Sequence, residues 1–268
     1  MRNMAETRLD SNGAPMDTDE ETRVAEEKKA RGNDHYVKKQ YAAALECYTA
    51  AIEASPASAA FYSNRAATFM MLNKWSEALA DARECVKLDP DYLKGYMREG
   101  KCHLVLGDPK SAIRSYQMAL QLEPGNEAAT AECQVAQAVL VHEKNAETDY
   151  ARKEFRRVVY SMDRALEHST RCSKYKLFKA ESLAMLGRFQ EAQELANDVL
   201  QGDTMNCDAL FVRGLCLYYA DNLEKAYQHF QQVFVHDGIT IPSRTIVLQA
   251  WVSSVPNFKH GIFVHDGI

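Results

Sequence analysis

Small and apolar residues recur along this chain with a period of 34 residues. Pro56, Pro90 and Pro124 are separated by 34 residues each, and other columns keep the same step. When segments are counted from residues 25, 59, 93, 139, 173 and 207, the eighth position is always small: Gly32, Ala66, Gly100, Ala146, Ala180 and Gly214. The twentieth position is also small in most segments: Ala44, Ala78, Ala112, Val158, Ala192 and Ala226. This self-similarity predicts six repeated structural units.

Each column has a physical reason if one unit is a hairpin of two helices. Small residues at the eighth and twentieth positions let the two helices approach closely. The seventeenth position is large and apolar in most segments and fills the space where the next helix crosses: Tyr41, Trp75, Pro109, Phe155, Phe189 and Leu223. Proline at the end of a segment stops the second helix and turns the chain. The pattern predicts an all-α fold, an α-solenoid of six helix-turn-helix repeats in two arrays of three.

The pattern also predicts where the chain divides. We expect a flexible acidic arm (1–24), repeats one to three (25–126), a helical spacer (127–138), repeats four to six (139–238) and an irregular tail (239–268). The spacer contains neither Gly nor Pro, which predicts one long helix that continues into the fourth repeat. Thr18-x-x-Glu21 resembles a capping box, so the first helix is expected to begin near it.

The tail holds an unusual repetition. Phe234-Val-His-Asp-Gly-Ile239 recurs as Phe263-Val-His-Asp-Gly-Ile268. Two interpretations are open, namely a short ligand motif used twice, or a duplicated segment at an aberrant terminus. We favour the second.

Composition narrows the class of partner. A net charge of −5 over 268 residues gives no basic field for nucleic acid or an anionic membrane. The seven cysteines are scattered and odd in number, which indicates a reducing compartment and free thiols. No apolar run is long enough to span a membrane, and the N-terminus has no secretory pattern. We expect a cytoplasmic protein, with the nucleus as a further compartment.

Five polar residues in the first three repeats are candidates for one binding site. Lys29 and Asn33 are four residues apart, as are Lys94 and Arg98, so each pair shares one face of a helix. Asn64 lies at a corresponding position of the repeat between them. Three cations and two amides on adjacent helices suit a partner that carries two nearby carboxylates.

The 34-residue columns resemble the tetratricopeptide repeat, whose arrays bind partners along a concave face lined by the first helix of each hairpin. In that register the five residues resemble the dicarboxylate clamp of chaperone-binding repeat domains. The resemblance implies partners in the Glu-Glu-Val-Asp tails of Hsp70 and Hsp90. Lys29, Asn33 and Asn64 would then hold the terminal carboxylate, Lys94 an acidic side chain, and Arg98 a carboxylate or carbonyl. Four further residues would line the same groove: Ala67, Met70, Met71 and Lys101.

The corresponding positions of the second array carry a different chemistry: Glu143, Glu147, Phe178, Asp208 and Val212. Acids replace cations there, so an acidic tail would be repelled. The partner of repeats four to six stays open.

Local sequence narrows the resemblance to the DnaJ-related co-chaperones of this class. It rests on the long spacer and on words such as Asn64-Arg-Ala-Ala-Thr-Phe-Met-Met-Leu72 and Arg98-Glu-Gly-Lys-Cys-His-Leu104. Such proteins continue into further repeats with a second clamp and a J domain. The His-Pro-Asp tripeptide of a J domain is absent from the sequence, so we expect a chain without that domain.

Catalytic patterns are missing. The sequence has no phosphate-binding loop, zinc-protease motif or nucleophile elbow, and its eight histidines show no metal-ligand spacing with the cysteines. We therefore expect no enzyme, no cofactor and no metal. Two hypotheses remain: a co-chaperone adaptor for Hsp70 and Hsp90 tails, and a general scaffold whose partners are not chaperones.

Overall fold

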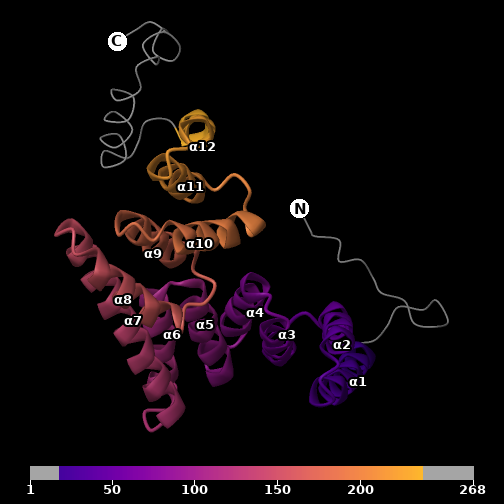
Figure 1. The fold of residues 1–268 in the computed structure, drawn as a ribbon. Helices are drawn as coiled ribbons and strands as arrows, with labels where there is room; N and C mark the ends of the chain where they lie inside the picture. Colours follow the sequence, from indigo (N-terminus) through magenta and orange to yellow (C-terminus); the bar gives the residue numbers. More distant parts are fainter. Residues whose placement is uncertain (1–17, 238–268) are drawn as a thin grey trace, which may run out of the picture. The chain divides into compact units, whose positions relative to one another are not determined.

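The computed structural model describes residues 18–237, and every regular element in that range is a helix (Figure 1). The helices are α1 (Thr18–Val37), α2 (Tyr41–Ala54), α3 (Ala59–Met71), α4 (Trp75–Leu88), α5 (Leu93–Leu106), α6 (Pro109–Leu122), α7 (Glu127–Ala151), α8 (Phe155–Leu166), α9 (Ser173–Met185), α10 (Phe189–Gly202), α11 (Cys207–Tyr219) and α12 (Leu223–Asp237). The predicted all-α fold of repeated helical hairpins is confirmed. The predicted tail and the second copy of the repeated hexapeptide lie outside the described residues.

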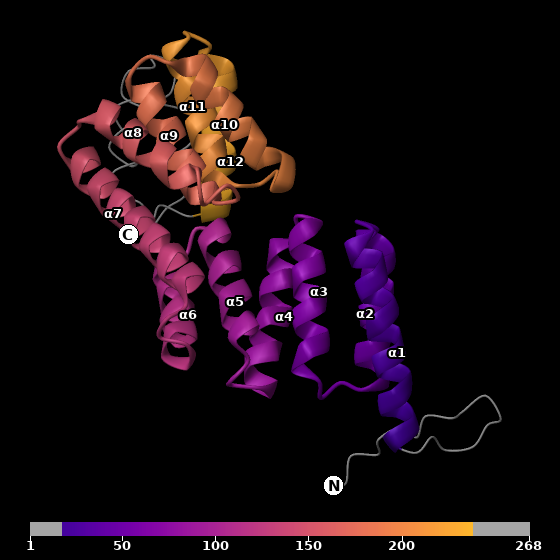
Figure 2. The ribbon, with the colours of Figure 1, turned by 90° about the horizontal axis from the view of Figure 1, so that it is seen from below.

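The helices form two compact units, which divide between Tyr175 and Lys176, inside α9. In the first unit α1 packs against α2, α3 against α4, α5 against α6 and α7 against α8. Figure 2 shows the first three of these hairpins side by side, with α2 against α3 and α4 against α5.

Helix α1 begins at Thr18, within the range that the sequence assigned to a flexible arm. Its first turn holds Asp19, Glu20 and Glu21. Carboxylates at a helix N-terminus interact favourably with the helix dipole. The helix therefore begins where the capping-box pattern indicated, and the arm cannot reach residue 24.

The predicted spacer is part of the long helix α7. The side chain of Asn126 caps this helix by accepting a hydrogen bond from the amide of Ala129, at 2.8 Å. Because α7 packs against α6 in its first part and against α8 later, the first unit continues through residues 127–138 without a break.

Small side chains bring the helices of each pair together. All six residues of the twentieth column are completely buried, four in the first unit and Ala192 and Ala226 in the second. Glycine in the eighth column has a more specific role. A Cβ atom at residue 32 would lie 2.7 Å from the ring of Tyr48, and one at residue 100 would lie 2.6 Å from the ring of Tyr116. Only glycine lets these rings pass so close to the neighbouring helix.

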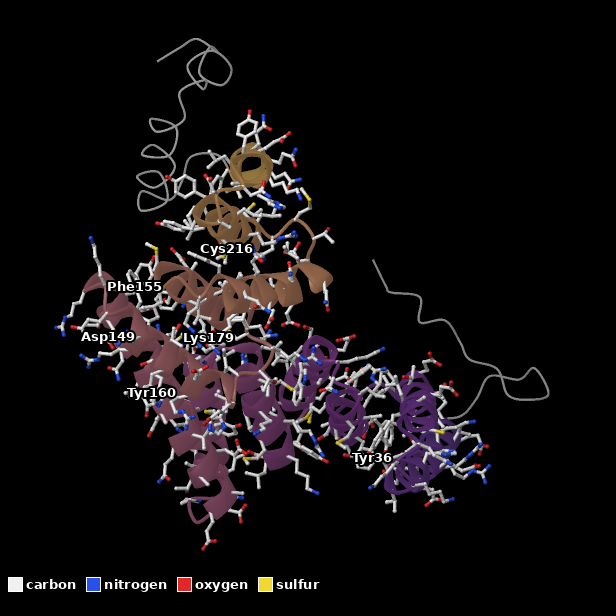
Figure 3. The ribbon with its side chains drawn as sticks, viewed as in Figure 1. Tyr36, Asp149, Phe155, Tyr160, Lys179 and Cys216 are labelled. Carbon is white, nitrogen blue, oxygen red and sulfur yellow. The ribbon has the colours of Figure 1, made fainter. Side chains whose placement is uncertain are left out.

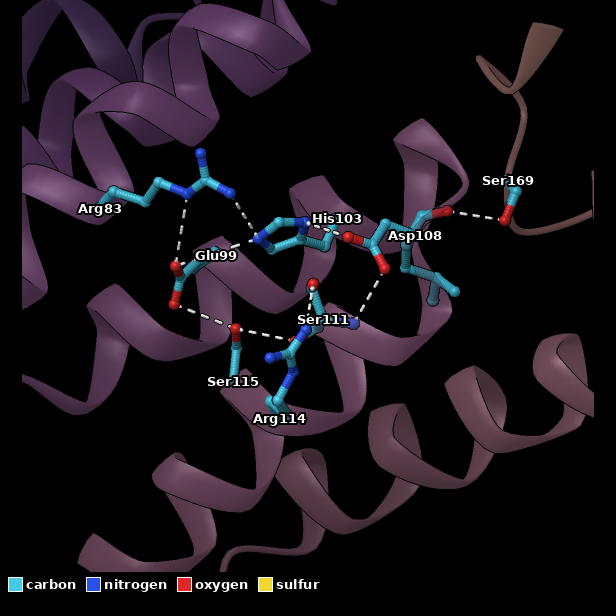
Figure 4. A network of polar contacts seen from close by, with 9 residues as sticks. Arg83, Glu99, His103, Asp108, Ser111, Arg114, Ser115 and Ser169 are labelled. Atoms are coloured by element: carbon cyan, nitrogen blue, oxygen red, sulfur yellow. Dashed lines mark hydrogen bonds and ion pairs between the residues drawn. The ribbon is translucent and has the colours of Figure 1, made fainter. Parts of the chain in front are cut away.

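The segment between α8 and α9 is tied to the end of α5. Ser169 Oγ donates to the carbonyl of Leu104 at 2.6 Å (Figure 4), and the amide of Arg171 donates to the carbonyl of Val105 at 3.1 Å. Cys172 then packs against Gly107. These contacts explain why the first compact unit extends past α8 to Tyr175.

The second unit repeats the same packing on a smaller scale. The rings of Phe189 and Tyr219 stack with their centroids 5.6 Å apart, joining α10 to α11. Phe230 of α12 lies against Gly214 of α11, where a Cβ would be 2.5 Å from the ring. Cys216, labelled in Figure 3, is fully buried in this unit, and burial raises its pKa to about 11.

The described helices were compared with the requirements of a membrane span and of a metal site. None of the helices in residues 18–237 combines the length and apolar content that crossing a membrane requires. In the same range, no three or more His, Cys, Asp or Glu side chains gather as a metal site would require. The seven cysteines are free thiols, and five of them are buried.

Candidate functional site

The five predicted carboxylate-binding residues lie on the first helices of three successive hairpins. Lys29 and Asn33 are on α1, Asn64 is on α3, and Lys94 and Arg98 are on α5. All three helices belong to the first compact unit, and α3 packs directly against α5.

The two predicted amides are in contact. Asn64 Nδ2 donates to Asn33 Oδ1 at 3.3 Å, which links α3 to α1. The hydroxyl of Tyr48, on α2, donates to the same oxygen at 2.7 Å. The oxygen of Asn33 is thus used inside the protein, which leaves its two N–H groups as donors for a ligand.

Arg98 has an unusual environment for a cation. It is half-buried, and its guanidinium donates to the hydroxyl of Ser63 on α3. No carboxylate among residues 18–237 forms an ion pair with it. Burial lowers the pKa of Arg98, and Tyr92, Tyr36 and Tyr48 are among the neighbours that act in the opposite direction. Tyr36 is labelled on α1 in Figure 3. Because Tyr48 also bonds Asn33, the guanidinium and the amide pair share one neighbourhood.

A second arginine of the same unit, Arg65, has its guanidinium paired with a carboxylate. Arg65 Nε and Nη2 donate to the two carboxylate oxygens of Asp81 at 2.7 and 2.9 Å. These hydrogen bonds raise the pKa of Arg65, against the effect of burial. Such two-pronged pairing is the geometry that a guanidinium favours with a carboxylate.

The two lysines differ in exposure. Lys29 is partly buried, pairs with Glu26 one turn earlier, and places its ammonium 5.8 Å from the centre of the Phe61 ring on α3. Lys94 is exposed in the first turn of α5, and within residues 18–237 no acidic side chain pairs with it. The structure therefore connects Asn33, Asn64 and Arg98, because Tyr48 is a neighbour of both Asn33 and Arg98. Lys29 contacts α3 through Phe61, and Lys94 is exposed to solvent.

The predicted groove-lining residues are less uniform. Ala67 and Met70 are half-buried on α3, and Met71 is exposed. Lys101 is engaged elsewhere, because its ammonium lies 3.2 Å from both carboxylate oxygens of Glu132 on α7. A role for these four residues in binding stays a prediction.

The equivalent positions of the later repeats carry acids that are already paired. Glu143 accepts from Lys174 at 2.6 Å, and Glu147 lies 3.9 Å from the same ammonium. In the second unit, Val212 is buried and cannot meet a ligand. Glu147, Phe178 and Val212 stand at the positions of Asn33, Asn64 and Arg98, so the paired amides and the half-buried arginine of the first three repeats are not repeated here.

Sequence reasoning missed the supporting residues, notably Tyr48, Ser63 and Phe61. The signal for Tyr48 was present, because a Gly at the eighth position of a hairpin makes room for a ring that reaches across it. No comparable signal marks Ser63, whose role depends on how α3 and α5 pack.

Comparison with known proteins bears on this arrangement. Residues 29–92 and 65–127 match the tetratricopeptide-repeat family, and together they contain all five predicted residues. Residues 29–127 are therefore tetratricopeptide repeats. The solved tetratricopeptide-repeat domain of P58(IPK) has the same fold, with a TM-score of 0.70 over 85% of this chain and 64% of that one, at 18% identity.

Two relatives are more similar in sequence to this repeat protein. DnaJ homolog subfamily C member 7 of Homo sapiens is 52% identical over 217 residues, which are 81% of this chain and 44% of the relative. The predicted likeness to a DnaJ-related protein is confirmed. Hsp70-Hsp90 organizing protein of Triticum aestivum is 42% identical over 104 residues, 39% of this chain and 18% of the relative. The chain thus spans less than half the length of these relatives.

Proposed function

We propose that this repeat protein is a non-catalytic co-chaperone adaptor that binds the acidic C-terminal tails of Hsp70 and Hsp90, of the Glu-Glu-Val-Asp type. The observation that carries the proposal is the environment of Arg98. Its guanidinium is half-buried near Tyr48, which also donates to Asn33, and within residues 18–237 it donates to the hydroxyl of Ser63 and forms no ion pair with a carboxylate.

A desolvated cation without an anion is unfavourable, and a carboxylate from outside the chain would relieve that cost. Arg65 shows that the same unit pairs a guanidinium with a carboxylate where one is available. Because no carboxylate within residues 18–237 pairs with Arg98, an anionic ligand is favoured over a purely structural role.

The surrounding donors suit a chain terminus with a second acid beside it. Lys29 and the outward N–H groups of Asn33 and Asn64 would hold the terminal carboxylate. Lys94, which is exposed, would meet an acidic side chain farther along the ligand, and Arg98 would take a carboxylate or carbonyl. Hydrogen bonds of this kind, with a charged partner, contribute about 1.5–3 kcal/mol each.

The relatives support the choice of partner. One relative is named as a DnaJ homolog, and another as an Hsp70-Hsp90 organizing protein. We place the protein in the cytoplasm, where both chaperones would be met, with the nucleus as a further compartment.

A general scaffold is the alternative, and one observation favours a second binding surface. Val141 and Tyr160, on α7 and α8 of the first unit, are exposed by 53% and 62%. Tyr160 is labelled in Figure 3. Exposed apolar side chains of this size can contact a further protein partner, so the later helices are free to bind something other than an acidic tail.

The test is a binding titration of the whole chain with a fluorescent Glu-Glu-Val-Asp peptide as the free acid and as the C-terminal amide. The proposal requires saturable binding of the free acid, weaker binding of the amide, and affinity that falls as salt rises, because the site is open to solvent. Equal affinity for the two peptides, or none for either, would leave the scaffold as the better description.

A further inference from the structure

Two neighbouring side chains, Tyr48 and Asn64, orient the side-chain amide of Asn33. An asparagine amide offers an oxygen that accepts and an NH₂ group that donates. In this protein the oxygen of Asn33 receives two hydrogen bonds, from Tyr48 at 2.7 Å and from Asn64 at 3.3 Å. Rotating the amide by half a turn would place its NH₂ group against the NH₂ group of Asn64, which cannot accept.

The ring of Tyr48 reaches this position because residue 32 is glycine. A Cβ there would lie 2.7 Å from the ring, so any other residue would push the phenol away. The consequence is that a residue of α2, on the far side of the hairpin, supplies a hydroxyl to the first helix.

The same close approach occurs at two other places, and these show that packing does not need the hydroxyl. Tyr116 lies against Gly100, and its hydroxyl donates to Glu132 at 3.3 Å, which is not one of the five candidate residues. Phe230 lies against Gly214 in the second unit with no hydroxyl at all. A phenylalanine ring therefore fits against a glycine at the eighth position, as a tyrosine ring does.

We infer that Tyr48 is a positioning residue for the ligand carboxylate: it holds the Asn33 amide with its donors outward and so makes the site select a free carboxylate over an amide terminus. This inference rests on the proposed function, since it concerns how the same site recognises a chain end. Without the hydroxyl, the Asn33 oxygen keeps only the longer hydrogen bond from Asn64. The amide then turns more readily and presents its oxygen to the ligand, where it repels a carboxylate and accepts from a terminal amide.

The hydroxyl can act as a donor throughout the physiological range. Burial raises the pKa of Tyr48 to about 12, although nearby Arg98 acts in the opposite direction. The phenol therefore keeps its proton wherever the ligand is a carboxylate.

The experiment compares Tyr48→Phe with Tyr116→Phe, using the free-acid and amidated Glu-Glu-Val-Asp peptides against the whole chain. We expect Tyr48→Phe to weaken free-acid binding by about threefold to tenfold, the effect of one neutral hydrogen bond. Binding of the amidated peptide should stay the same or improve, so the ratio of the two affinities falls. Tyr116→Phe should leave that ratio unchanged.

A double-mutant cycle shows whether Tyr48 acts through Asn33. In an Asn33→Ala background, Tyr48→Phe should change free-acid affinity by less than about twofold, because the amide it orients is gone. An undiminished effect in that background would overturn the inference, as would an equal loss for both peptides, which is the mark of a structural role.

The outcomes also separate this inference from the function on which it rests. If the unsubstituted chain fails to bind the free-acid peptide, both are overturned. If it binds and Tyr48→Phe keeps the same preference for free acid over amide, the tail-binding function stands and the positioning role is wrong.

Discussion

The guanidinium of Arg98 on α5 donates to the hydroxyl of Ser63 on α3, so a half-buried cation is held by a neutral partner. Only two residues after Ser63, Arg65 makes a two-pronged ion pair with Asp81. The guanidinium of Arg65 is thus neutralised by a carboxylate of the protein. That of Arg98 has no such partner within residues 18–237 and is available to a carboxylate of a ligand. We therefore expect Arg65 to contribute mainly to stability and Arg98 mainly to binding.

Removing Arg98 should abolish most tail binding. Losing a charged hydrogen-bond donor costs about 1.5–3 kcal/mol, so Arg98→Ala should weaken the free-acid peptide roughly tenfold to a hundredfold. Lys94→Ala should cost less, because an exposed charge is screened by water and salt. The double variant should leave almost no measurable affinity while circular dichroism shows unchanged helicity.

Glu143→Gln is the matched control, because Glu143 occupies the equivalent position of a later repeat and pairs with Lys174. It should leave peptide affinity as it is. Full affinity in the Lys94/Arg98 double variant would contradict the proposed site and favour the scaffold.

The two arginines should also differ in what they do to stability. Arg98→Met removes a desolvated cation that no carboxylate of the described chain neutralises, and should raise the free energy of unfolding by about 1 kcal/mol. Arg65→Met leaves the buried carboxylate of Asp81 without its partner and should lower that free energy by about 3–5 kcal/mol. Urea unfolding followed by circular dichroism measures both. Equal losses for the two variants would show that Arg98 is a structural residue.

Much of this could be predicted from the sequence, because the repeat columns report on packing between residues within one hairpin. Small residues at the twentieth position, such as Ala44 and Ala78, predict two helices in close approach. Both alanines are fully buried in the structure. The register of the columns then places Lys29, Asn33 and Arg98 on first helices without any further information.

The remaining features depend on contacts between distant segments, which the spacing of residues along the sequence does not reveal. Ser63 supports Arg98 only because α3 packs on α5. The end of the first unit at Tyr175 depends on Ser169, whose hydroxyl meets the backbone carbonyl of Leu104, 65 residues earlier. A carbonyl is the same for every residue, so this partner leaves no trace in the sequence.

His103 should make the protein less stable in mild acid. Figure 4 shows its ring between Arg83 of α4, Glu99 on its own helix and Asp108 at the start of α6. Burial is the main cause that lowers the pKa of His103 below 6.5; Asp108 and Glu99 act against it, and Arg83 and Arg114 with it. The unfolded chain therefore binds a proton more readily than the folded one, so stability falls as the pH drops below about 6.5.

His103→Gln should remove this contribution, which amounts to at most about 1.4 kcal/mol per pH unit. The measurement is the urea midpoint between pH 7.5 and 5, where the variant should show a shallower decline. His229, whose pKa burial also lowers, continues to contribute in both proteins. His168→Gln, at an exposed position, is the control and should follow the unsubstituted chain. An identical decline in the His103 variant would show that this histidine plays no part.

The last prediction concerns Gly107, which joins α5 to α6 and faces the segment before α9. Its φ of 87° lies in the left-handed region, and a Cβ there would be 2.2 Å from Sγ of Cys172. Gly187 is the natural comparison, because its φ is 78° but no heavy atom beyond its chain neighbours lies within 4 Å of the corresponding Cβ position. Gly→Ala at either site should cost about 1–2 kcal/mol in backbone strain. At residue 107 the clash should add about 1–3 kcal/mol, since Cys172 is held by its neighbours.

Hydrogen exchange distinguishes the two effects. The amide of Arg171 donates to the carbonyl of Val105, so its protection reports directly on whether the segment is docked. Gly107→Ala should lower that protection strongly and reduce the urea midpoint more than Gly187→Ala does. The Gly187 variant should leave the Arg171 amide as protected as before, because its strain lies in the turn between α9 and α10. Equal losses of stability, with Arg171 still protected in the Gly107 variant, would mean that Cys172 can move aside and that the segment is held by Ser169 and Arg171 alone.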